Sequence, residues 1–159
     1  MTEAERIAAH EAGHACACVL LGVPVRLVDV AGDAKALGRV RHGLEDIKTP
    51  DDARKRMLIV LCGQIEGADH WHEVPSWPLN PNASTDEYNL HALAEYLRLD
   101  ERGYNKIAGE ALALTLAPEY QMLHVAITGM LGYFPRIGPA MIDRLYRMVR
   151  EAREEPWNA

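Results

Sequence analysis

The sequence is organised around IAAHEAGHACACVLLGVP at residues 7–24, which predicts a long first helix. Upstream, Thr2 and Glu5 have the spacing of an N-terminal capping box, and Gly22 and Pro24 supply a stop. About 19 residues lie between these signals, which corresponds to roughly 28 Å of helix. Because residues 12–21 are small or apolar except for His14, we expect the helix to be central and buried.

The same stretch contains a His-Glu-x-x-His motif, formed by His10, Glu11 and His14. A separation of four residues puts both imidazoles on one face of a helix, where they can bind one zinc ion. Glu11 is rotated by about 100° from His10, so its carboxylate can reach a water on the metal rather than the metal itself. That water has a pKa lowered to about 7 and can lose its proton to Glu11 as it attacks a peptide carbonyl. The alternative, two purely structural core histidines, is disfavoured because buried imidazoles without partners are costly.

A zinc site with these histidines needs a third protein ligand. The metzincin continuation is missing, since the positions concerned are Ala17 and Leu20. Asp86 heads a series of apolar residues at i+4, i+7 and i+11 of a predicted helix, so it faces the core, whereas Glu87 falls on a solvent-facing side. An acid in the first turn also stabilises a helix by itself, but this role does not require an inward orientation. The preferred ligand is therefore Asp86. The next choice is Glu66. The other candidates are Asp69, His70, His72 and Glu87.

The rest of the chain predicts a mainly α-helical domain of the α+β class, a single unit over residues 1–159. Val- and Leu-rich runs at 25–30 and 37–41 predict a β-hairpin next to the first helix. Residues 69–83 hold three prolines and two tryptophans, and a loop of this length is usually functional or mobile. The further helices are predicted at 50–66, 84–99, 105–116, 119–131 and 139–154.

Composition argues against several classes of function. With 17 basic and 23 acidic side chains the net charge is −6, so neither nucleic acid nor an anionic membrane is expected as the main partner. No run reaches the ~18 apolar residues of a membrane span. The cysteines Cys16, Cys18 and Cys62 are odd in number and lack a metal-site spacing. We therefore expect them to be reduced core residues of a cytoplasmic protein.

Taken in order, these motifs resemble the peptidase domain of the FtsH family of AAA-linked zinc proteases. His10-Glu11-Ala12-Gly13-His14 matches the HEAGH motif of that family in every residue. Three further segments are similar to family segments on the hairpin, on the next helix and around the third ligand; they are Ala36-Leu37-Gly38, Leu61-Cys62-Gly63-Gln64 and Ser84-Thr85-Asp86-Glu87. The resemblance implies a helical metallopeptidase fold, Zn²⁺ as cofactor and Glu11 as catalytic base. The zinc ligands that it implies are His10, His14 and Asp86.

The chain departs from that family because it has no Walker A motif and no membrane helix. We therefore expect a metalloendopeptidase that hydrolyses polypeptide substrates without an ATPase of its own, with folded substrates supplied by a separate ATPase or adaptor. One alternative is a dedicated regulatory protease with one or a few targets. Another is a non-catalytic domain that only binds partners, which the intact Glu11 disfavours. The strand at 37–41 is a candidate edge for binding an extended peptide; the alternative is a strand that only covers the core.

Overall fold

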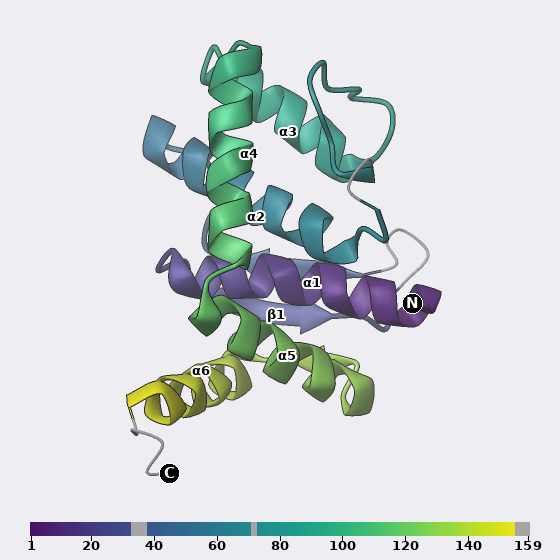
Figure 1. Ribbon diagram of the computed structural model, residues 1–159, viewed down its shortest axis with the longest axis vertical. Coiled ribbons are helices and arrows are strands. Elements are labelled where there is room, and N and C mark those ends of the chain that lie inside the picture. Colours follow the sequence, from purple (N-terminus) through teal and green to yellow (C-terminus); the bar gives the residue numbers. More distant parts are fainter. Residues whose placement is uncertain (33–37, 71–72, 155–159) are drawn as a thin grey trace.

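The computed structural model describes residues 1–32, 38–70 and 73–154, and it confirms a mainly helical fold with a small antiparallel sheet (Figure 1). The helices are α1 (Glu3–Leu20), α2 (Pro50–Gly67), α3 (Thr85–Tyr96), α4 (Glu101–Thr115), α5 (Pro118–Tyr133) and α6 (Pro139–Glu154). The strands are β1 (Val25–Asp29), β2 (Arg39–His42) and β3 (Arg136–Ile137). None of the helices in the described part of the chain is long and apolar enough to cross a membrane.

Helix α1 is the centre of the structure, as its sequence predicts. Its N-terminus is held by the expected capping box, in which Thr2 Oγ1 accepts the N–H of Glu5 (3.3 Å) and the Glu5 carboxylate accepts the N–H of Thr2 (2.7 Å). Just beyond its end, Gly22 has a φ of +70°, a conformation that glycine adopts without strain. In Figure 1, α2, α3 and α4 lie on one side of α1, and α5 and α6 lie on the other.

The sheet has the strand order β2-β1-β3, so that β1 is central and β2 lies at an edge. Val28 in the middle of β1 is opposite Val40 of β2 on one side and Ile137 of β3 on the other. The hairpin and its edge strand agree with the sequence prediction, although Ala36 and Leu37 lie outside the described residues. Strand β3 was not predicted, because two residues are too few to show an alternating pattern.

One helix start was wrong in the sequence analysis. Helix α4 begins at Glu101 rather than near residue 105, because the Asp100 carboxylate accepts the N–H of Gly103 (2.8 Å) and caps the helix earlier. The other predicted helices begin and end within about three residues of their observed bounds, which is the usual uncertainty of a helix end.

The described part of the loop between α2 and α3 is anchored to α4. Its Pro75 carbonyl accepts a hydrogen bond from the Tyr104 hydroxyl (2.7 Å), and the Trp77 and Tyr104 rings lie 6.0 Å apart. Pro75 and Leu79 are buried. This segment therefore has its own packing against the domain, which a loop rich in proline does not reveal from sequence alone.

Helices α1 and α2 approach each other closely at Gly13. A Cβ atom at this position would lie 2.8 Å from the carbonyl oxygen of Cys62 and 3.0 Å from the Cα of Gly63. Both atoms belong to the α2 backbone and cannot move independently. The two helices are therefore in backbone contact, which requires a glycine at position 13.

We predict that Gly13→Ala lowers the free energy of unfolding by about 1–3 kcal/mol, the usual effect of overpacking. The matched control is Gly109→Ala in the middle of α4, where a new Cβ meets no atom within 4 Å. This control should stabilise the protein by about 0.5–1 kcal/mol, because alanine favours a helix. Denaturant unfolding of the metal-free proteins measures both effects. Equal stability of the two variants would contradict the close contact.

Candidate metal centre

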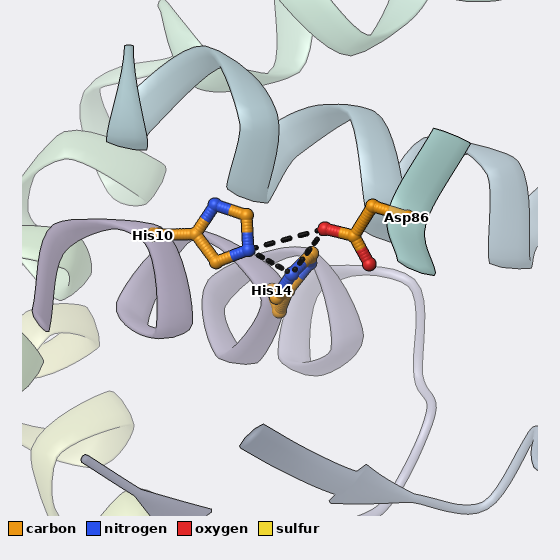
Figure 2. Close-up of side chains that lie close together, drawn as sticks. All are labelled: His10, His14 and Asp86. Carbon is orange, nitrogen blue, oxygen red and sulfur yellow. Dashed lines mark hydrogen bonds and ion pairs between the residues drawn. The ribbon is translucent and has the colours of Figure 1, made fainter. Parts of the chain in front are cut away.

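Three side chains from two helices converge on one point (Figure 2). Helix α1 contributes His10 and His14, and the first turn of α3 contributes Asp86. The Nε2 atoms of the two histidines are 2.9 Å apart, and Asp86 Oδ2 lies 3.1 Å from His10 Nε2 and 3.5 Å from His14 Nε2. Ligand atoms of a tetrahedral zinc site are about 3.3 Å from one another. The observed separations therefore fit one small cation bound by all three residues.

The tautomer of His14 suits a metal ligand. Its Nδ1 lies 2.8 Å from the carbonyl oxygen of Ile59 on α2. A carbonyl only accepts hydrogen bonds, so Nδ1 carries the proton and donates the hydrogen bond. In the neutral ring, Nε2 then has a free lone pair, and this atom is the one that faces His10 and Asp86. A backbone carbonyl is one of the usual partners that orient a metal-binding histidine.

Asp86 is held in place by α2 and by the start of its own helix. The Gln64 side chain donates a hydrogen bond to Asp86 Oδ2 (2.7 Å). Ser84 caps α3 by accepting the N–H of Glu87 (3.1 Å), and this fixes Asp86 in the first turn. The inward orientation that the apolar periodicity predicts for Asp86 is therefore confirmed, and Gln64 is a further residue of the site that the sequence analysis did not single out.

The electrostatics of the three residues favour a bound positive charge. Burial alone would raise the pKa of Asp86, but in the metal-free site hydrogen bonds from the two imidazoles, when these carry a proton on Nε2, outweigh this and hold the pKa well below its ordinary value. Burial alone would lower the pKa of His14, but the hydrogen bond and charge of Asp86 raise it overall. The aspartate is thus ionised, so its carboxylate and the neighbouring imidazole nitrogens can bind one cation together.

Two glycines of α2 make room for the two imidazoles. A Cβ at Gly63 would lie 2.2–2.5 Å from ring atoms of His14, and a Cβ at Gly67 would lie 2.8 Å from the Cβ of His10. The glycines are four residues apart, as are the histidines that pack on them. This pairing was not predicted from the sequence, although a Gly-x-x-x-Gly spacing that matches the His-x-x-x-His spacing is visible in the chain.

Glu11 lies outside the ligand set and is buried, with 5 % of its surface exposed. Gly38, just before β2, covers it so closely that a Cβ there would lie 2.7 Å from Glu11 Oε1. Glu11 Oε2 has no hydrogen-bond partner among the described residues. Burial raises the pKa of this carboxyl, and the electrostatic interaction with His14 and His10 offsets part of the rise. These are properties of a group that can accept a proton rather than of a structural anchor.

A cavity of about 660 Å³ opens over the three ligands and Glu11. Its walls come from α1, α2 and the start of α3, and from the edge strand β2 through Val40 and His42. The edge strand therefore borders the candidate metal centre directly.

The remaining ligand candidates in the described part of the chain do not join this cluster. Glu66 faces His124 of α5 at 3.6 Å, and Asp69 faces Arg6 at the surface. His70 is exposed, and His72 lies outside the described residues. Glu87 was expected on a solvent-facing side, but its Oε2 is buried and has no hydrogen-bond partner in the described part of the chain.

Helix α5 contacts the backbone of the motif helix through two side chains that the sequence analysis did not assign. His124 Nε2 lies 3.0 Å from the carbonyl oxygen of Ala9, and the Tyr120 hydroxyl donates to the carbonyl of Gly13 (3.1 Å). These carbonyls are four residues apart, one just before His10 and one just before His14. No local pattern indicates such contacts, because more than a hundred residues of sequence separate the partners.

Comparisons with protein-family models, with curated proteins and with solved structures give no match for this chain. The functional interpretation therefore rests on the residues and their geometry.

We predict that Asp86→Ala weakens zinc binding by at least about 100-fold, because it removes one of the three side chains that would bind the ion. Glu66→Ala is the matched control, since it removes another partly buried carboxylate that the structure places in a separate pair. Calorimetric titration of the metal-free proteins with zinc, against a competing chelator, measures both. A protein that keeps its zinc in the Asp86 variant and loses it in the Glu66 variant would reverse the assignment.

Proposed function

We propose that this chain is a zinc-dependent metalloendopeptidase similar to the peptidase domain of the FtsH family, acting on polypeptide segments without an ATPase of its own. The observation that carries the proposal is the pairing of a three-ligand cluster with a buried glutamate that is not a ligand. A purely structural metal site needs no such carboxylate and is normally closed by four protein ligands. Here His10, His14 and Asp86 leave a fourth position toward the cavity.

The residues of the site suit hydrolysis of a peptide bond. Bound zinc supplies a Lewis acid and a water whose pKa is lowered to about 7. Gln64 and the Ile59 carbonyl hold two of the ligands in fixed orientations, so that little reorganisation is needed during the reaction. Glu11 accepts the proton of the attacking water and passes it to the amide nitrogen that leaves. Its raised pKa suits the first step, because it makes the carboxylate a better base at neutral pH.

The edge position of β2 supports the binding of a substrate in an extended conformation. Among the described residues, strand β2 pairs with a neighbour, β1, on one side only, and its residues line the cavity next to the ligands. A polypeptide that added to this edge as a further strand would form main-chain hydrogen bonds and place its backbone beside the metal. Such binding requires that the backbone groups of the substrate are not already paired.

The proposal includes a cytoplasmic location and a separate ATPase or adaptor for folded substrates. Cys16, Cys18 and Cys62 are buried and unpaired, and burial raises the pKa of each thiol. They are therefore inert core residues that are compatible with a reducing compartment.

Glu11→Gln separates the metal site from the chemistry. We expect the variant to bind zinc as tightly as the unmodified protein, because all three ligands remain, and to cleave an unfolded protein at least about 100-fold more slowly, because the proton acceptor is lost. Metal content per chain and cleavage rate are measured on the same preparations, with and without a chelator. Removal of zinc should abolish cleavage by the unmodified protein, and added zinc should restore it.

Two outcomes of this experiment would count against the proposal. Loss of zinc in parallel with activity would show that Glu11 is part of the metal site and not the base. Equal behaviour of the two zinc-loaded proteins would leave a metal-bound interaction domain as the better description.

We also predict that the zinc-loaded protein cleaves unfolded segments and leaves stable folded domains intact, without any requirement for ATP. The test uses one small domain in two states, folded and unfolded by a destabilising substitution, at equal concentration. The Glu11→Gln protein serves as the blank. Equal cleavage of both states would show recognition of a folded surface and would favour a dedicated regulatory protease.

A further inference from the structure

We propose that the cavity beside the metal centre is a cationic groove that binds polypeptide segments with acidic side chains on both sides of the metal. This inference rests on the proposed peptidase function for the identity of the ligand as a polypeptide. The preference for acidic side chains is inferred from the charges that line the cavity.

The charged groups of the cavity fall into two sets. The carboxylates that line it, among the described residues, are Glu11 and Asp86, and both belong to the candidate metal centre. The remaining charged lining residues are Arg6, Arg39 and Arg56. A divalent cation at the centre would offset the two carboxylates. The charge that a substrate then meets along the groove is that of the guanidinium groups.

Two of these arginines lie at opposite ends of the metal centre. Helices α1 and α2 run antiparallel, because His14 packs on Gly63 and His10 on Gly67. Arg6 precedes His10 by one turn of α1, about 6 Å along the helix. Arg56 precedes Gly63 by seven residues of α2, about 10 Å beyond the level of His14.

The spacing corresponds to positions along an extended chain. A strand rises about 3.3 Å per residue, so a segment lying along β2 would bring side chains two to three residues from the metal within reach of each guanidinium. The preference is therefore expected at positions flanking the metal centre on both sides, and not at the residue directly over it.

The arginines keep their positive charge for a ligand. Arg56 donates to two carbonyl oxygens, those of Leu44 (3.2 Å) and Glu45 (2.9 Å), which are uncharged partners. Its charge acts inside the cavity, since burial and the nearby Arg56 lower the pKa of the lining residue His42 to about 4. Arg6 lies 3.6 Å from Asp69, with 44 % and 37 % of their side chains exposed, and such exposed pairs are weak.

Arg39 is linked to a shared carboxylate. It lies 3.6 Å from the buried Asp29, which Arg136 also contacts at 3.1 Å. Arg39 is therefore paired within the domain, and the preference is assigned to Arg6 and Arg56.

The net charge of −6 does not oppose this local preference. Charges more than about 8 Å apart are largely screened at physiological ionic strength. The groups that line the groove thus have the strongest influence on what binds in it. Of the acidic side chains elsewhere, Asp69 beside Arg6 and Asp29 beside Arg39 are close to the lining guanidinium groups.

The experiment compares two fluorescent peptides with one apolar core, bearing either Glu or Lys at the second and third positions on each side. Binding to the zinc-loaded Glu11→Gln protein is measured by fluorescence anisotropy, so that hydrolysis does not interfere. We expect the acidic peptide to bind at least about tenfold more tightly at low salt, and the ratio to shrink as salt shortens the screening length. Equal binding, or tighter binding of the basic peptide, would overturn the inference.

Charge reversal at Arg6, at one end of the groove, tests whether this residue contributes to the preference for acidic peptides. Arg6→Glu should remove or reverse the preference, whereas Arg102→Glu, a matched change at an exposed position of α4 outside the cavity, should leave it in place. A similar loss in both variants would show an effect of net charge and would contradict the groove. Because Arg56 also holds the 44–45 backbone, it is tested with a pair: Arg56→Lys should retain the preference and Arg56→Gln should weaken it.

Cleavage by the unmodified zinc-loaded protein separates this inference from the proposed function. A preference in binding without any hydrolysis would contradict the peptidase and support the groove. Hydrolysis of both peptides at equal kcat/KM, with equal binding, would support the peptidase and contradict the groove.

Discussion

The structure depends on the contact between two imidazoles of α1 and two glycines of α2. His14 packs on Gly63 and His10 on Gly67, and at Gly63 even a methyl group would come within 2.2 Å of the ring. Between them, Gly13 brings the two backbones together. This approach places the Ile59 carbonyl within 2.8 Å of His14 and Gln64 within 2.7 Å of Asp86. The same packing that fills the core thus sets the orientation of the ligands, and the site cannot be loosened without loosening the helix pair.

Much of the fold and of the site follows from local patterns in the sequence. The capping box at Thr2, the four-residue spacing of the histidines and the apolar phase behind Asp86 are each defined within one helix, and periodicity reports on such features directly. The elements that escaped prediction depend on contacts between distant segments. Strand β3 exists because it pairs with β1, and His124 meets a carbonyl 115 residues away. Likewise Glu87 is half-buried, with its Oε2 atom covered by its tertiary surroundings, although its place on the helix predicts exposure.

Strand β2 links the proposed base to the proposed substrate edge. Gly38 at its start lies against the Glu11 carboxylate, while Val40 and His42 further along line the cavity. On its other side β2 pairs with β1, which α1 and β3 also contact. A substrate that paired with β2 would therefore lie on a strand whose position is fixed by the core. Such rigidity matters for hydrolysis, because a displacement of about 1 Å between reacting groups can reduce a rate by 100-fold.

The burial of Glu11 is hard to account for by stability alone. A carboxylate with one oxygen lacking a partner among the described residues destabilises a folded chain by about 1–3 kcal/mol, and more when it is charged. Replacing it with a residue of similar size and no charge would remove that penalty, and the surrounding helix is otherwise built from small apolar residues. Proteins retain unsatisfied groups of this kind where the group has a chemical task. Desolvation that weakens the fold also raises the proton affinity of the carboxylate, so the same feature that is unfavourable for folding is what a general base requires.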